Sequence, residues 1–389
     1  MVRTPRVALV CDFVEENWPS MDLIAEMLFE NLHRDHASTF SVTRFCPSMR
    51  LRFSRLHLAG VGSISTNADR FCNRFLDYPR WLKDRMRDID LFHVVDHSYA
   101  QLVHELPAAR TVVSCHDLDA FRCVLEPERE KRSRPFRIMT SRILAGLQKA
   151  AHLITVSPII RDEIVQHGLF PPEQVTVIPN GVHPSCSPET NPASEVEVER
   201  LLGPEPAGAI WLLNVGSTIP RKRLDVLLRV FAAVRREIPD VRLIRVGGGM
   251  TRAQLQLARD LTIDESVFTF PRLSWDVLAA VYRKADLLLQ TSEAEGFGLP
   301  VIESLACGCP VVVSDLPVLR EVAGTAATYC PVADVGAWKA AVIALIEERT
   351  QSPGSWEYRR KLGIARAARF SWAESARQTA QVYRKVLQI

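Results

Sequence analysis

The sequence predicts an α/β protein made of two doubly wound domains, each built on a parallel β-sheet. Three observations lead to this fold class. Short β-branched segments alternate with longer helical patterns along the 389 residues. The apolar segments are continuous, which is typical of parallel strands covered by helices on both faces. A stretch rich in Pro, Ser and Glu separates two halves of similar length, so we expect two domains of ordinary size joined by a linker.

The strands are short and punctuated by Gly, Pro and polar residues. In the first half they are expected over Arg6–Phe13, Phe40–Phe45, Leu91–Val95, Thr111–Cys115, Leu153–Val156 and Val175–Ile178. In the second half they are expected over Ile210–Val215, Arg242–Val246, Val267–Phe270, Leu287–Gln290 and Val311–Ser314.

Helical periodicity fills the intervals between the strands. The clearest patterns are Met21–Leu32, Leu224–Glu237, Trp275–Arg283 and the amphipathic closing segment Ser371–Leu387. The resulting division is an N-terminal domain over residues 1–183, a linker over 184–208, a C-terminal domain over 209–370 and a closing helix over 371–389.

The composition indicates a globular protein with reduced thiols. Hydrophobic residues make up 47% of the chain and charged residues 24%, and the net charge of +3 is too small to favour nucleic acid as a partner. The N-terminus lacks signal-peptide features, and no segment approaches ~18 consecutive apolar residues. The nine cysteines are scattered, and Cys307 and Cys309 have no second pair at zinc spacing. We therefore expect a cytoplasmic protein.

One segment of the first half is strongly basic. Residues 44–87 contain ten Lys or Arg against three Asp or Glu, and residues 129–142 repeat the bias. Two interpretations are open, a solvated basic face or a patch that meets an anionic membrane or an anionic acceptor. The apolar residues interleaved with these charges are Leu51, Phe53, Leu56, Phe71, Phe75, Tyr78 and Trp81.

Two glutamates eight positions apart, in EAEGFGLPVIE, flank two glycines and a proline. The glycines disfavour a helix and Pro300 suits a first helical turn, so Glu295 is expected in a loop. Glu303 is expected in the first turn of a helix over Val301–Cys307. The amides from Phe297 to Val301 would then form an anion site at the helix N-terminus. The alternative is a plain strand-to-helix turn.

Two further loops follow predicted strands. The loop that begins at Gly216 carries Arg221, Lys222 and Arg223, a cluster that suits a diphosphate, although an ordinary basic loop would look the same. The segment VGGGM, residues 246–250, lets the backbone approach a ligand closely. It fails as a dinucleotide fingerprint because Arg252 stands at the third glycine position, which disfavours a dehydrogenase.

In the first half, His116 and Asp117 follow a predicted strand. A histidine just past a parallel strand end is a good functional candidate, and a structural His–Asp pair is the alternative. The sequence shows no metal-ligand spacing, no serine nucleophile elbow and no Walker P-loop.

Together these residues resemble the E-x7-E signature of glycosyltransferase family 4. The resemblance extends over nearly the whole chain and includes VSPIIRDEI, VIPNGV, the basic loop, the glycine run and the closing FSW…VY. It implies the GT-B fold, in which two Rossmann-like domains face each other across a cleft and the C-terminal helix crosses back to the N-terminal domain. It also implies a retaining enzyme whose N-terminal domain is on the acceptor side.

The resemblance gives roles to individual residues. Glu303 would hold the ribose of the donor, and Glu295 and His116 would contact the transferred sugar. Lys222, with Arg221, would neutralise the leaving diphosphate. The other donor contacts would be Phe297, Gly298, Leu299, Ser217, Gly216, Gly248 and Leu273, with possible contacts from Pro19, Ser20 and Met21 in the first N-terminal loop.

The sequence departs from the family pattern in two loops. Ser217 stands where the family often has an arginine, a change for which Arg221 could compensate. The loop from Glu16 to Met21 lacks the usual glycine pair, and Ser20 could cap a helix over Asp22–Leu32.

The expected function is transfer of a hexose from a UDP- or GDP-sugar to a saccharide or lipid-linked saccharide, with retention and without a metal or other cofactor. The protein would be cytoplasmic, and a peripheral position at the inner membrane face stays open. The alternatives are a sugar-nucleotide epimerase of the same fold and a non-catalytic subunit that binds nucleotide sugars. Acceptor identity and oligomeric state stay open.

Overall fold

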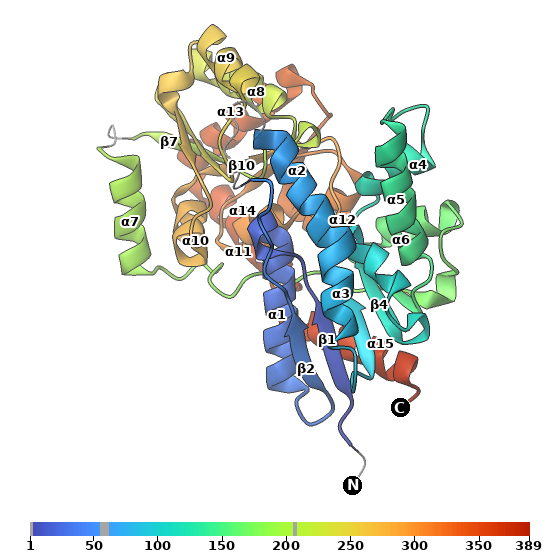
Figure 1. Ribbon diagram of the computed structural model, residues 1–389. Coiled ribbons are helices and arrows are strands. Elements are labelled where there is room, and N and C mark those ends of the chain that lie inside the picture. Colours follow the sequence, from blue (N-terminus) through green and yellow to red (C-terminus); the bar gives the residue numbers. More distant parts are fainter. Residues whose placement is uncertain (1–2, 55–61, 205–207) are drawn as a thin grey trace. The chain divides into compact units, whose positions relative to one another are not determined.

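The chain divides into two compact units, which are described separately (Figure 1). Unit 1 comprises Met1–Gly181 and Trp372–Ile389, and unit 2 comprises Val182–Ser371. The computed structural model describes residues 3–54, 62–204 and 208–389. No helix in these ranges combines the length and apolarity that crossing a bilayer requires.

Unit 1 is built on a six-stranded parallel sheet in the order β2-β1-β3-β4-β5-β6. The order reverses between β1 and β3, which is the topological switch point of a doubly wound sheet. The central strands β3, β4 and β5 are buried along their whole length, as continuous apolar strands require, whereas the edge strands β2 and β6 are only partly buried. The strands are β1 Arg6–Val10, β2 Ser41–Phe45, β3 Leu91–Val94, β4 Thr111–Cys115, β5 His152–Thr155 and β6 Val175–Val177.

The helices of unit 1 cover both faces of its sheet. The closing helix packs against the first helix and is held to β3 by a hydrogen bond of 2.7 Å between Tyr383 and His93 Nδ1. The helices are α1 Pro19–Asp35, α2 Gly62–Cys72, α3 Tyr78–Lys83, α4 Arg122–Leu125, α5 Arg134–Leu147, α6 Pro158–Gln166 and α15 Trp372–Leu387. A π-helical turn, Asn73–Asp77, joins α2 to α3, and 3-10 turns include Val14–Glu16, His97–His104, Ala108–Arg110, Asp119–Phe121 and Pro172–Gln174.

Unit 2 carries a second six-stranded parallel sheet, in the order β12-β11-β10-β7-β8-β9. Read from β9, this is the strand order 3-2-1-4-5-6 of the dinucleotide-binding fold, with its switch point between β7 and β10. The strands are β7 Ile210–Val215, β8 Val241–Val246, β9 Val267–Phe270, β10 Leu287–Gln290, β11 Val311–Ser314 and β12 Ala327–Cys330.

Helices α8, α9 and α13 pack together in unit 2, and α10, α11 and α14 form another packed group (Figure 1). The buried face of α8 and Trp338 of α13 close one hydrophobic core over the sheet. The helices are α7 Pro192–Leu202, α8 Leu224–Glu237, α9 Arg252–Asp260, α10 Trp275–Lys284, α11 Leu299–Ala306, α12 Pro317–Ala323, α13 Val335–Gln351 and α14 Pro353–Ala367.

The stretch expected as a linker, residues 184–208, differs from the prediction. It belongs to unit 2 and contains α7, which packs against α10; residues 205–207 lie outside the described ranges. Pro192 stands in the first turn of α7, where proline favours a helix, and the carboxylate of Glu195 lies 2.8 Å from Arg283 Nε. Its Pro-rich composition therefore marks a helix start.

Two other expectations also need correction. Strand β12 was not predicted, because its ATYC sequence is short and mostly half-buried. Helix α1 begins at Pro19 with Trp18 as its N-cap residue, so Ser20 lies inside the first turn and no side chain caps the helix. A proline at the first helical position needs no hydrogen-bond donor there, which lets the helix start earlier than expected.

Candidate active site

The loops that the sequence singled out in unit 2 follow three adjacent strands of its sheet, two of which flank the switch point. The basic loop follows β7, the glycine run follows β8, and the loop with Glu295 follows β10. Because the strands are parallel, their carboxyl ends lie on one edge, where ligands of doubly wound sheets bind. This edge of unit 2 is the candidate donor site.

Lys222 and Glu295 form the centre of this site. The ammonium nitrogen of Lys222 lies 2.7 and 2.8 Å from the two carboxylate oxygens of Glu295. Gln290 Nε2 and Ser292 Oγ also donate to Glu295 Oε1, at 2.5 and 2.7 Å. Burial alone would raise the pKa of Glu295, but Lys222 above all holds it below its ordinary value. Glu295 is therefore an ionised carboxylate that accepts three of these bonds through Oε1 and one through Oε2.

The other two cations of the basic loop are also tied to neighbours. Arg221 Nη1 donates to the carbonyl of Ala294 at 3.1 Å and lies 3.9 Å from Glu295 Oε2. Arg223, which has a left-handed φ of 48°, pairs with Asp225 and Glu293 at 3.0 Å each. The cluster that suggested a diphosphate is thus largely neutralised by carboxylates of its own unit.

Glu303 lies deeper in unit 2 than expected. Helix α11 begins at Leu299, so Glu303 is its fifth residue and not part of the first turn. Tyr282 donates its hydroxyl to Glu303 Oε2 at 2.9 Å. Burial raises the pKa of Glu303 to about 7, and the bond from Tyr282 opposes this shift.

The N-terminus of α11 offers fewer amides than the predicted run from Phe297 to Val301. Pro300 has no amide hydrogen, and the amide of Val301 donates to the carbonyl of Gly298 at 2.9 Å. Within the described ranges, the amides of Phe297, Gly298 and Leu299 donate no hydrogen bond. Gly298 has a φ of 97°, and a Cβ there would stand 2.7 Å from Leu319, so the turn requires glycine.

The glycine run after β8 lies directly against the loop after β7. The amide of Gly216 donates to the carbonyl of Val246 at 2.9 Å. A Cβ at Gly247 would stand 2.4 Å from the carbonyl oxygen of Gly216. Ser217 and Leu273, two other predicted donor contacts, are half-buried on the loops after β7 and β9.

The sequence analysis missed Arg245, the penultimate residue of β8. Its side chain is fully buried and donates to the carbonyls of Gly216, at 2.9 Å, and of Gly248. The only signal in the sequence was a second arginine in the strand VRLIRV, near its carboxyl end.

In unit 1, His116 follows β4 as predicted, but it forms no pair with Asp117. Its Nε2 donates to the carbonyl of Val95 at 2.8 Å, and its Nδ1 has no hydrogen-bond partner in the part of unit 1 that the structure describes. The side chain is 7% exposed, and burial lowers its pKa. This geometry leaves Nδ1 as the acceptor nitrogen of a neutral ring.

Three residues with no predicted role, His97, Asp96 and Asp12, lie at the same edge of the sheet as His116. His97 lies 3.3 Å from Asp96 and 3.6 Å from Asp117; burial opposes its protonation, yet these carboxylates raise its pKa. Asp12, after β1, interacts with Asp96, and its pKa is raised by burial first and then by Asp96. These groups lie at the carboxyl ends of β1, β3 and β4, the central strands of the sheet. The signal was the repeated pattern of an apolar strand followed by Asp or His.

The first N-terminal loop places Pro19, Ser20 and Met21 in the first turn of α1, with Ser20 exposed and the other two half-buried. Nothing in this geometry assigns them a ligand.

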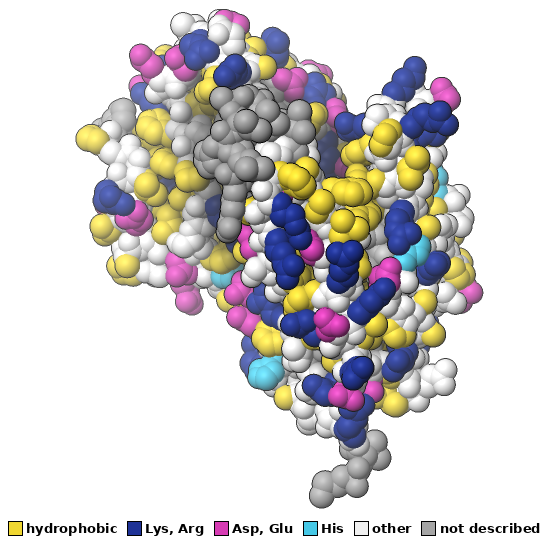
Figure 2. All heavy atoms as spheres, in the orientation of Figure 1, with side chains coloured by type: hydrophobic (Ala, Val, Ile, Leu, Met, Phe, Trp, Pro, Cys, Tyr) yellow, Lys and Arg dark blue, Asp and Glu magenta, His cyan; other side chains and the backbone are white. Residues whose placement is uncertain are grey.

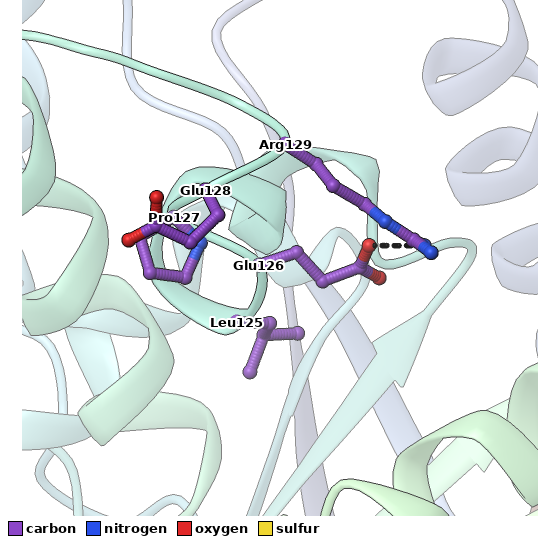
Figure 3. Close-up of a pocket in the computed structure, with 5 residues that line it drawn as sticks. All are labelled: Leu125, Glu126, Pro127, Glu128 and Arg129. Atoms are coloured by element: carbon purple, nitrogen blue, oxygen red, sulfur yellow. Dashed lines mark hydrogen bonds and ion pairs between the residues drawn. The ribbon is translucent and has the colours of Figure 1, made fainter.

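One group of side chains in unit 1 has ligand atoms at metal-binding spacing among the described residues. Atoms of Glu126, Glu163 and His167 lie within 4.8 Å of one another. Arg122 donates to Glu126 at 2.7 Å and lies 2.5 Å from Glu163, so one guanidinium is already paired with both carboxylates. A surface pocket of about 360 Å³ lies beside this group. Figure 3 shows the residues that line it, Leu125, Glu126, Pro127, Glu128 and Arg129. None of these residues was predicted to act in a site.

Two family models match the chain. Glycosyltransferase Family 4 matches residues 25–185, and Glycosyl transferases group 1 matches residues 203–367.

Individual relatives agree with the family models. The chain is 34% identical over 238 residues to a D-inositol 3-phosphate glycosyltransferase of Thermobispora bispora, an alignment that covers 58% of this chain and 54% of that protein. It is 29% identical over 281 residues to the O-antigen chain mannosyltransferase B of Escherichia coli, covering 71% of this chain and 70% of that protein. The chain thus spans about half the length of the inositol-phosphate relative.

Among solved structures, the sucrose-phosphate synthase of Thermosynechococcus elongatus is similar over 99% of this chain and 100% of that chain, with a TM-score of 0.73 and 20% identity. This likeness confirms the GT-B fold. The two family models, which together match most of the chain, show that it belongs to the glycosyltransferases of family 4.

Proposed function

We propose that the protein transfers a hexose from a UDP- or GDP-sugar to a saccharide or lipid-linked saccharide, with retention of configuration and without a metal. The observation that carries this proposal is the Lys222–Glu295 pair at the switch point of unit 2, at 2.7 Å. In the same loop, the amides of Phe297, Gly298 and Leu299 donate no hydrogen bond to any described residue. A cation, a carboxylate and amide donors in one place suit a donor made of a sugar and a diphosphate.

The reaction breaks the bond between the anomeric carbon and the diphosphate oxygen, and the electron pair stays with the diphosphate. Preorganised positive charge at that oxygen lowers the barrier. In the proposal Lys222 and Arg221 supply this charge, with the amides of Phe297 and Gly298. Glu303 accepts hydroxyls of the ribose and Glu295 accepts hydroxyls of the sugar.

Glu295 is unsuited to act as the nucleophile of a double displacement, because it already accepts bonds from Lys222, Gln290 and Ser292. The leaving phosphate can instead accept the proton of the incoming acceptor hydroxyl on the same face, which retains the configuration. By the family resemblance His116 would contact the donor sugar, and the nitrogen left for such a contact is Nδ1, because Nε2 donates to the carbonyl of Val95.

A panel of nucleotide sugars tests the proposal. UDP-glucose, UDP-galactose, UDP-N-acetylglucosamine and GDP-mannose would be incubated with neutral and lipid-linked saccharides, and products detected by mass and by anomeric NMR signals. We expect one donor class to be used and the product to keep the donor's anomeric configuration. An epimerised nucleotide sugar would support the epimerase instead, and tight binding without any turnover would support the non-catalytic subunit.

The same assay tests whether the reaction needs a divalent metal ion. We expect initial rates within about twofold of each other in 5 mM EDTA and in 5 mM MgCl2 or MnCl2, because Lys222 and Arg221 take the role that a Lewis acid would otherwise have. A rate that EDTA abolishes and Mn²⁺ restores would contradict this part of the proposal.

The acceptor part of the proposal includes contact with an anionic membrane through residues 44–87. The structure limits which side chains can take part. Tyr78 is fully buried, and Phe75 and Trp81 are partly buried against the core. The exposed apolar side chains are Leu51, Phe53, Phe71 and Leu76, and Leu56 lies outside the described residues. Figure 2 shows hydrophobic side chains beside Lys and Arg over α2 and α3. In this proposal the protein works at the inner face of the cytoplasmic membrane.

Replacing Phe71 by serine should weaken binding to anionic vesicles several-fold, because its side chain is 50% exposed beside basic residues. Co-sedimentation with vesicles of phosphatidylglycerol and phosphatidylcholine measures the effect. Tyr358→Ser, which removes an aromatic ring 68% exposed in unit 2, is the matched control and should leave binding unchanged. Equal binding to neutral and anionic vesicles would contradict the membrane proposal.

A further inference from the structure

Arg245 is the buried cation of the donor site. Its guanidinium is 0% exposed, and its two terminal nitrogens reach different loops, one donating to Gly216 O at 2.9 Å and the other to Gly248 O. One side chain on β8 therefore fixes the backbone of both the β7 and the β8 loop at the switch point of unit 2.

These two hydrogen bonds also set the direction of the peptide groups. In a planar trans peptide the carbonyl and the following amide hydrogen point in opposite directions. Because the carbonyls of Gly216 and Gly248 turn towards Arg245, the amides of Ser217 and Gly249 turn away from it. Neither amide donates a hydrogen bond to any residue that the structure describes. Two amide donors therefore point to the side of the loops that faces away from Arg245.

No carboxylate among the described residues balances the charge of Arg245. Lys222 pairs with Glu295, and Arg223 pairs with Asp225 and Glu293. Arg245 has no ion pair within the described ranges, and its neighbours in register on the sheet are Asn214 and Thr269, both neutral. Burial lowers its pKa to about 10, so the guanidinium stays charged at neutral pH. A buried charge without a partner is costly unless an anion comes close.

We propose that Arg245 is a positioning residue of the donor site, which presents the amides of Ser217 and Gly249 to the diphosphate and places an uncompensated positive charge beneath it. This inference rests on the proposed function, because the anion is taken to be the diphosphate of the donor. It assigns Arg245 no contact with the reacting atoms.

Calorimetric titration of the full-length protein with UDP and GDP, and with uridine and guanosine, tests the inference. Arg245→Met keeps most of the volume but removes charge and donors. It should weaken binding of UDP or GDP, whichever the wild-type protein binds more tightly, about tenfold or more. It should also raise the donor KM more than it lowers kcat, and change nucleoside binding far less. Arg245→Lys keeps the charge, so it should recover part of the diphosphate affinity.

Arg242→Met is the matched control, because Arg242 lies on the same strand and donates to the carbonyls of Pro239 and Val241 near the other end of β8. It should leave diphosphate affinity unchanged. If Arg245 had a purely structural role, the methionine variant would have a lower Tm and would bind nucleosides and nucleoside diphosphates more weakly by the same factor. That result overturns the inference. Unchanged diphosphate affinity in Arg245→Met overturns it as well. If the wild-type protein binds neither UDP nor GDP, the proposed function fails first.

Discussion

Replacing Lys222 by alanine should lower kcat about 100- to 1,000-fold, the loss expected when one preorganised group that stabilises transition-state charge is removed. Lys222 is the cation closest to Glu295, at 2.7 Å, so it lies where the sugar and the leaving diphosphate are proposed to meet. Its removal also leaves the buried carboxylate of Glu295 without its main partner, which should raise the pKa of that group. Initial rates at saturating donor measure the effect.

Two further variants separate the chemistry from the loss of stability. Lys222→Ala combined with Glu295→Gln removes the unpaired buried charge, so it should recover thermal stability while turnover stays low. Lys339→Ala breaks an exposed ion pair with Glu237, at 3.3 Å, and should keep wild-type rates because such pairs contribute little. A Lys222→Ala protein that turns over the donor at the wild-type rate would remove Lys222 from the mechanism.

The fold could be predicted from the sequence because its signals are local. Continuous apolar segments identified eleven of the twelve strands, and the missed strand β12 is only partly buried. The strand ends then pointed to the loops with Lys222, Glu295 and His116. The first residues of helices were predicted less well, because helices begin at Pro19 and Pro192, where the sequence resembled a loop.

The electrostatics of the site could not be predicted in the same way. Pairing of Lys222 with Glu295, 73 positions apart, follows from the order in which β7 and β10 lie side by side. The same holds for Asp12 and Asp96, which the switch point of unit 1 brings together from β1 and β3. The three consecutive cations of the basic loop can be seen in the sequence. The hydrogen bond from Arg245 to the loop after β7 cannot, because it depends on the register of β7 and β8.

The buried carboxyl group of Glu303 at the proposed site lowers the free energy of unfolding at neutral pH. Burial raises its pKa from an ordinary 4.5 to about 7, so the folded state holds a proton that the unfolded state releases between these values. Over that range the unfolded chain binds fewer protons, and the free energy of unfolding therefore falls as pH rises. Above pH 7 the loss is complete and amounts to about 3 kcal/mol. Below pH 4.5 both states are protonated and the loss is absent.

Glu303→Gln should therefore raise the free energy of unfolding by about 1 to 3 kcal/mol at pH 8 and change it little near pH 4.5, because glutamine does not ionise. Tyr282 can still donate its hydroxyl to the amide oxygen. The same substitution should weaken donor binding, because a carboxylate accepts hydrogen bonds from ribose hydroxyls more strongly than an amide does. Urea unfolding at both pH values and titration with UDP or GDP measure the two effects.

The wild-type protein should also bind the donor more tightly as pH rises towards 7, because the carboxylate is the form that accepts the hydroxyls, and this dependence should disappear in Glu303→Gln. Glu347→Gln, an exposed glutamate on α13, should change neither stability nor binding. A stability gain of equal size at both pH values would show that packing, and not the ionisation of Glu303, sets the cost. Stability and donor affinity make opposite demands on this one carboxyl group, since the uncharged form suits the buried position and the charged form suits the ligand.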